Sequence, residues 1–151
     1  MQTLQTLLGQ AESARDAAQA ALRIAVDAAE RARAQLDQLQ TYRGEYQQRW
    51  QAQFSRHAAI EIVQCYRSFM DRLEQAVAQQ QRVSEQVERQ AEHARTRLSE
   101  CELRVASVRK LIERRLHELE QRQRRIDQKR DDEAAQRAAW QRPKATDTSF
   151  H

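Results

Sequence analysis

Residues 50–59 read WQAQFSRHAA, and they separate two long heptad stripes of apolar residues that are out of phase with each other. The first stripe alternates steps of four and three residues from Leu4 to Trp50, and 12 of its 14 positions are apolar. The second takes the same steps from Ala59 to Ile126, and 16 of its 20 positions are apolar. A period of 3.5 residues held over this length is typical of a coiled-coil seam.

The break in phase predicts a hairpin. Trp50 and Ala59 are nine residues apart, which fits neither step of the stripe, so we expect the chain to turn within residues 51–58. Ser55 is the best candidate to cap the second helix, because its hydroxyl can accept a hydrogen bond from a first-turn amide. The alternative is one continuous helix with a shift in phase.

The composition agrees with a helical rod, since only two Gly and one Pro interrupt the chain and 32% of the residues are charged. We expect helix one at about residues 2–51 and helix two at about 57–141, where Pro143 stops it. The predicted fold class is all-α, a long antiparallel two-helix coiled coil. Residues 1–143 would form a single domain, and residues 144–151 a disordered tail.

The two stripes have unequal lengths, so helix two is expected to overhang helix one. A turn near residue 54 makes residue i face about residue 108 − i, and helix one then covers helix two only to about Val105. An exposed apolar stripe of such length marks an interaction site, unless the register is different or two copies pair. The apolar residues of the expected overhang are Val105, Val108, Leu111, Ile112, Leu116, Leu119 and Ile126.

The charge is unevenly placed along the chain. The formal net charge is +4, and residues 104–144 hold 13 Lys and Arg against seven Asp and Glu. This basic end could meet an acidic protein surface, nucleic acid or anionic lipid, or simply be a solvated helix face. The segment Arg122–Arg142 with Trp140 is only a weak nucleic-acid signal, because it lacks interleaved aromatic residues.

The sequence contains no catalytic, cofactor-binding or metal-binding pattern, so we expect no enzymatic activity and no cofactor. Cys65 and Cys101 would lie about 54 Å apart on a continuous helix, which excludes a disulfide between them. Free thiols fit a reducing cytoplasm. We find neither a signal peptide nor a run of apolar residues long enough for a transmembrane helix.

Aromatic residues gather near the expected turn. Bulky rings there can seal the end of a thin coiled coil, or Phe69, which lies beside the seam, can face a partner. The six residues are Tyr42, Tyr46, Trp50, Phe54, Tyr66 and Phe69.

Three segments together resemble the FliJ family, the small coiled-coil proteins of the bacterial flagellar export apparatus. They are YRGEY at residues 42–46, YRSFMDRLEQAVAQQ at 66–80 and DQKRDDEAAQRAA at 127–139. Their order and spacing extend the resemblance over nearly the whole chain. The resemblance implies an antiparallel coiled coil similar to the central stalk of rotary ATPases.

The resemblance also implies partners. Members of this family sit in the pore of the hexameric export ATPase and promote its assembly, contact the cytoplasmic domain of the membrane export gate, and help to handle export chaperones. The gate-contacting face of the family corresponds to Phe69, Leu73, Ala76 and Gln80, the last of which is His in some relatives. The expected contacts with the ATPase ring are Val105, Val108, Ile112, Leu119, Arg122 and Ile126.

The expected function is therefore that of a stalk-like coupling protein, cytoplasmic and peripheral to the inner membrane. The free protein would be a monomer able to self-associate weakly, and it would bind no nucleic acid. Two alternatives remain open at this point. One is the equivalent stalk protein of a virulence-type secretion system, and the other is a basic coiled coil that binds nucleic acid.

Overall fold

The computed structural model describes residues 1–54 and 59–141, which form two α-helices, α1 (Gln2–Phe54) and α2 (Ile60–Gln141). Ala, Gln and Arg are frequent in both helices, and all three are good helix formers. Helix α1 ends three residues later than expected, and α2 begins three residues later than expected. The turn between them therefore lies later in the chain. The expected cap at Ser55, the stop at Pro143 and the tail 144–151 lie outside the described residues.

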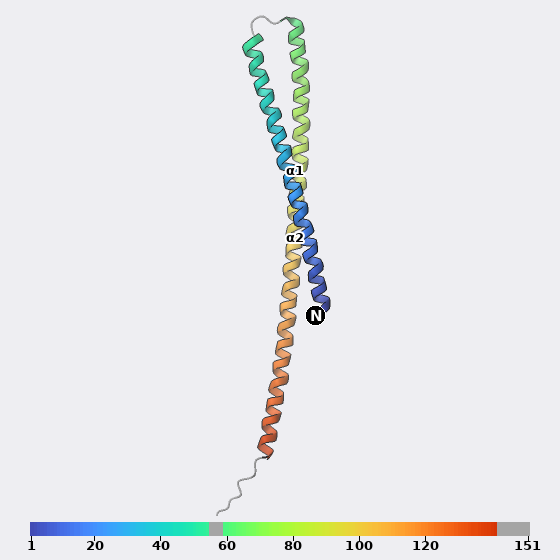
Figure 1. The fold of residues 1–151 in the computed structure, drawn as a ribbon, viewed down its shortest axis with the longest axis vertical. Coiled ribbons are helices and arrows are strands. Elements are labelled where there is room, and N and C mark those ends of the chain that lie inside the picture. Colours follow the sequence, from blue (N-terminus) through green and yellow to red (C-terminus); the bar gives the residue numbers. More distant parts are fainter. Residues whose placement is uncertain (55–58, 142–151) are drawn as a thin grey trace, which may run out of the picture. The chain divides into compact units, whose positions relative to one another are not determined.

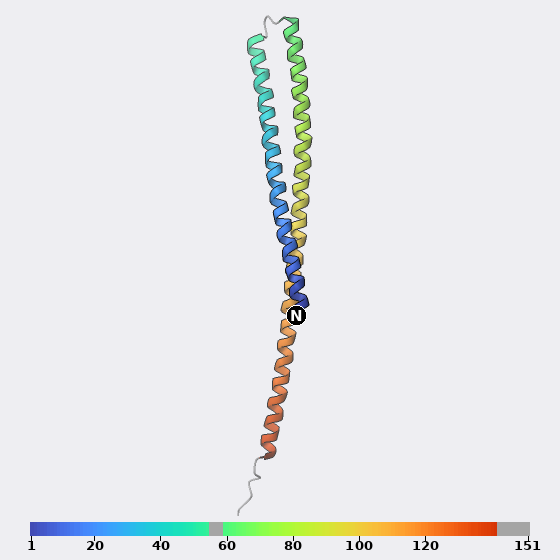
Figure 2. The ribbon, with the colours of Figure 1, turned by 45° about the vertical axis from the view of Figure 1, so that its right-hand side comes forward.

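The chain divides into two units, one made of Gly9–Val105 and the other of Met1–Leu8 with the chain from Ala106 onward. In the first unit α1 and α2 lie side by side and run in opposite directions, as both ribbon views show (Figure 1 and Figure 2). The expected all-α helical hairpin is thus confirmed. That residues 1–143 form one domain stays a prediction.

The two stripes form the seam between the helices. Every stripe position from Leu4 to Trp50 in α1, and every stripe position from Val63 to Ile112 in α2, is buried or half-buried. The two helices contribute side chains of different size, because α1 buries mainly Ala whereas α2 buries larger residues. The buried apolar residues are Ala11, Ala18, Ala32, Met70, Leu73, Val77, Ala91, Val105 and Val108.

Contacts across the seam fix the register of the hairpin. The residue numbers of a contacting pair add up to 111 for Tyr42 and Phe69, 116 for Trp50 and Tyr66, and 121 for Arg33 and Glu88. Residue i therefore faces about residue 116 − i. The expected register, in which residue i faces about residue 108 − i, is wrong by about one heptad, because the turn lies later in the chain than assumed.

The end of the covered stripe moves accordingly. Val105 and Val108 are only 2% and 7% exposed, so the expectation that they protrude beyond α1 is wrong. In the unit that contains both chain ends, Leu4 and Leu8 of α1 are half-buried, as is Ile112 of α2. In that unit the buried or half-buried part of the α2 stripe ends at Ile112, because every residue from Glu113 to Gln141 is exposed.

Gly9 and Gly44 both lie inside α1, and a Cβ atom added at either would meet nothing within 4 Å. We expect the double variant Gly9→Ala with Gly44→Ala to be more stable by about 1 kcal/mol per site, because Ala loses less backbone entropy in a helix. Urea unfolding followed by circular dichroism measures this gain. A double variant less stable than the parent chain would mean that at least one of these sites requires glycine.

Candidate interaction surfaces

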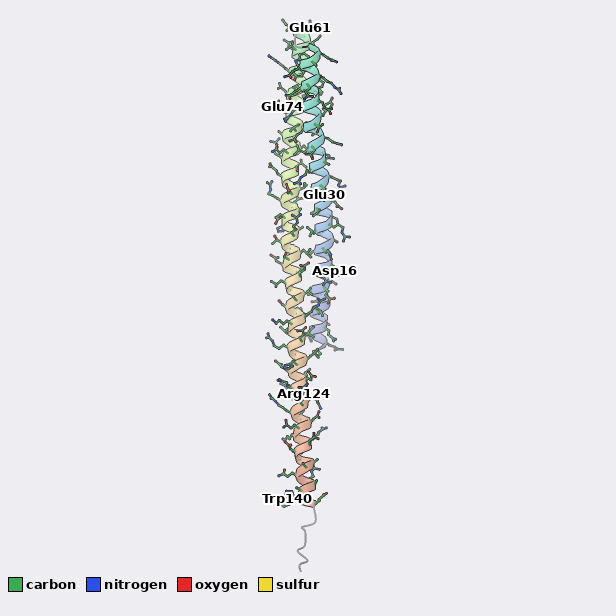
Figure 3. All side chains as sticks on the ribbon, turned by 90° about the vertical axis from the view of Figure 1, so that its left-hand side faces the viewer. Asp16, Glu30, Glu61, Glu74, Arg124 and Trp140 are labelled. Atoms are coloured by element: carbon green, nitrogen blue, oxygen red, sulfur yellow. The ribbon has the colours of Figure 1, made fainter. Side chains whose placement is uncertain are left out.

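The last part of α2 has no cover. Every residue from Glu113 to Gln141 is exposed, and we call residues 113–141 the bare segment. Figure 3 labels Arg124 and Trp140 on this segment, where side chains project to both sides of the helix in the view shown. Trp140 is 84% exposed. A helix that is bare all round needs another source of stability than its own core, such as a partner.

Apolar side chains continue the seam stripe into the bare segment. Leu119 and Ile126 follow Ile112 at intervals of seven residues, and they are 40% and 48% exposed. Leu116 lies near the same stripe and is 50% exposed. The stripe positions of α2 up to Ile112 pack against α1. The bare segment continues this stripe, and its stripe residues have no partner helix among the described residues.

Basic residues occupy the alternate positions of this stripe. Arg115, Arg122 and Lys129 follow one another at intervals of seven residues, between the apolar positions. Lys129 was not among the expected contacts, although one further step of the stripe from Ile126 reaches it. The bare segment therefore presents apolar and basic side chains alternately along one line, a pattern that favours a surface with both apolar and acidic groups.

Part of the charge in the bare segment is paired along the helix itself. Arg115 contacts Glu118 at 3.7 Å, and Arg124 contacts Glu120 at 3.7 Å. These groups are half or more exposed, so such pairs contribute little to helix stability. Residues 122–130 nevertheless contain five basic residues and one acidic residue, and their excess positive charge remains available to a partner.

A cluster of aromatic side chains closes the hairpin near the turn. The ring centroid of Tyr46 lies 4.5 Å from that of Phe69. The ring of Tyr46 also stacks on the ring of Tyr66, with 5.8 Å between the centroids. Trp50 also stacks on Tyr66, with 4.2 Å between the two ring centroids. Tyr42 also contacts Phe69, edge to face at 6.3 Å. The cluster joins both helices, as expected for a cap on a thin coiled coil.

The four residues expected to contact the export gate lie in different surroundings. Leu73 is buried in the seam, 7% exposed. Gln80 also lies in the seam, and its amide donates a hydrogen bond to the carbonyl oxygen of Ala32 at 3.0 Å. Phe69 is half-buried against tyrosines, and Ala76 alone is exposed. The face that this structure offers to a partner thus consists of Ala76 and the outer edge of Phe69.

The six residues expected to contact the ATPase ring divide in a similar way. Val105 and Val108 are buried and Ile112 is half-buried, whereas Leu119, Arg122 and Ile126 are exposed in the bare segment. Sequence reasoning missed this division because it depends on the register of the hairpin. The stripe itself was correctly identified, but the point at which its cover ends was not.

The described residues contain no group of three or more His, Cys, Asp or Glu that could hold a metal ion. Cys65 is exposed, Cys101 is half-buried, and both are free. Within residues 1–54 and 59–141, neither helix has a stretch long and apolar enough to cross a membrane.

Comparison with known proteins gives one match. The family model described as "FliJ: Flagellar FliJ protein" matches residues 1–144, which is nearly the whole chain. No curated protein and no solved structure matches.

Proposed function

This chain belongs to the FliJ family and is therefore a protein associated with flagellar export, and from that premise we propose that it is a stalk-like coupling protein for the export ATPase. The FliJ family has a structural and coupling role and is not catalytic. In the proposal, the bare segment docks onto the hexameric ATPase and promotes assembly of the ring. The hairpin links the ring to the cytoplasmic domain of the export gate and to export chaperones.

The bare segment is the observation that carries this proposal. A seam stripe that is covered as far as Ile112 continues uncovered through Leu119 and Ile126. Burying such side chains against a partner would contribute roughly 1.5–3 kcal/mol for each one fully buried. The basic residues between them favour a partner surface that carries acidic groups and guides association at long range.

A binding assay with the purified export ATPase tests the proposal. The full chain is expected to co-sediment with the hexamer and to raise its rate of ATP hydrolysis. A chain that neither binds the ATPase nor changes its activity would contradict the proposed coupling role. Location on the cytoplasmic side of the inner membrane, peripheral to it, is part of the same proposal and can be checked by fractionation of cells.

The gate contact is best tested at Ala76, because the other candidates also stabilise the hairpin. Ala76 is exposed, so Ala76→Glu should change the free energy of unfolding by less than about 0.5 kcal/mol. Binding to the gate cytoplasmic domain should weaken about tenfold or more, since a charge would be buried in the contact. Calorimetric titration of the purified gate domain measures this change.

The matched control is Ala78→Glu, which places the same charge at an exposed position two residues further on. It should leave gate binding unchanged, because residues two apart point to different sides of a helix. Equal weakening by both variants would indicate a general charge effect, and no weakening by Ala76→Glu would remove the gate contact from this face.

A further inference from the structure

Gln80 is a polar residue in an otherwise largely apolar seam, and its amide makes two hydrogen bonds to α1. It donates to the carbonyl oxygen of Ala32 at 3.0 Å and to the side-chain oxygen of Gln35 at 3.2 Å. A helical carbonyl oxygen has a second lone pair, so Ala32 can accept this bond besides its own helical one. The neighbouring stripe positions on α2, Val77 and Ser84, are both buried.

The apolar stripes alone permit more than one alignment of α1 with α2. In the observed register Leu36 lies about opposite Gln80, and Leu39 about opposite Val77. A shift of one heptad would place Leu36 opposite Leu73 and Leu39 opposite Met70, which are equally good apolar partners. Because both helices repeat every seven residues, packing of the stripes distinguishes these alignments weakly.

The hydrogen bonds of Gln80 distinguish them better. After the same shift, the position of Gln35 relative to Gln80 would be taken by Ala28, whose side chain has no acceptor. One of the two bonds would then be lost at a partly buried amide, which is unfavourable. The ion pair of Arg33 with Glu88 also depends on the register. Both side chains are more than half exposed, so this pair contributes little to the free-energy difference between the two registers.

We propose that Gln80, through Gln35 and the Ala32 carbonyl, fixes the register of the hairpin and so determines where the bare segment begins. A polar residue at one seam position commonly selects a register at some cost in stability. Here the selected register covers the stripe of α2 up to Ile112. A shift of one heptad toward the expected register would expose Val108 and Ile112 and lengthen the bare segment by about two turns.

Cysteine crosslinking tests the proposal in the full chain, with Cys65→Ser and Cys101→Ala removing the native thiols. The pair Arg33→Cys with Glu88→Cys reports the observed register, since these side chains meet across the seam. The pair Arg33→Cys with Gln81→Cys reports the register shifted by one heptad. With Gln80 present, a short bismaleimide should crosslink the first pair about tenfold more efficiently than the second.

Gln80→Leu should lower this ratio at least about fivefold, with the melting temperature unchanged or higher, because a seam leucine packs well in either register. Gln75→Leu is the matched control, since it makes the same substitution at an exposed position and should leave the ratio unchanged. Gln35→Ala removes only one acceptor, from an exposed side chain that the fold does not require, and should lower the ratio about twofold. An unchanged ratio in either Gln80→Leu or Gln35→Ala would overturn the proposal.

Discussion

Replacing Leu119 and Ile126 by Glu is expected to abolish binding to the export ATPase while the hairpin stays folded. Both side chains are exposed and belong to the bare segment, so their loss removes no contact within the chain. If a partner covers them, the double variant loses at least about 3 kcal/mol of binding, equivalent to more than a hundredfold in Kd. Co-sedimentation and the rate of ATP hydrolysis measure the effect, and circular dichroism confirms that the helices are retained.

The control for this variant adds the same charge elsewhere on the bare segment. Gln121→Glu with Gln128→Glu introduces two negative charges at exposed positions off the stripe and leaves Leu119 and Ile126 intact. It should weaken binding only modestly, and less so at high salt, since exposed charges are screened. If the stripe variant still stimulates the ATPase as the parent chain does, the bare segment is not the docking surface.

Tyr46→Ala is expected to destabilise the hairpin by about 3 kcal/mol, the largest effect of a single substitution near the turn. The ring of Tyr46 contacts three other aromatic rings, those of Tyr42, Tyr66 and Phe69, at 6.2, 5.8 and 4.5 Å. Each such pair contributes about 0.5–1.5 kcal/mol beyond the area that it buries. Unfolding in urea, followed by circular dichroism, gives the change in free energy.

Tyr46→Phe separates the role of the ring from that of the hydroxyl group. It keeps all three ring contacts, and we expect its free energy of unfolding to lie within about 0.5 kcal/mol of the parent chain. A Tyr46→Ala variant as stable as Tyr46→Phe would mean that the aromatic cluster does not hold the end of the hairpin together. The cluster would then be free to serve a partner instead.

The seam of this protein could be predicted from sequence because its apolar residues recur at alternating steps of four and three residues. All stripe positions from Leu4 to Trp50 were correctly expected to face the other helix. Even the polar stripe residue Gln80 lies in the seam, although its type did not indicate this. The spacing of residues decided burial here more strongly than the hydropathy of any one of them.

The register could not be predicted in the same way. A pattern that repeats every seven residues looks the same after a shift of seven, so the expected alignment depended entirely on where the turn was placed. No Gly or Pro marks that turn. The signals that distinguish registers are specific pairs, such as Trp50 with Tyr66 and Gln80 with Gln35, and these become visible only once both helices are placed.

The partner-facing residues were predicted with mixed success for a related reason. Phe69 and Leu73 match the gate face of the family, but in this structure both also pack between the helices. A substitution there would alter stability and binding together. Only a residue such as Ala76, which is exposed and makes no contribution to the seam, allows the two effects to be measured separately.

The two tryptophans of the chain stand in opposite surroundings, and this gives the protein a spectroscopic reporter of its own. Trp50 is stacked on Tyr66 in the aromatic cluster, whereas Trp140 is 84% exposed near the end of α2. In a Trp50→Phe chain, Trp140 would be the sole source of indole fluorescence and would emit at the long wavelength of a solvated ring. Occupation of that end by an apolar surface would move the emission to shorter wavelength, so association could be followed in real time without an added dye.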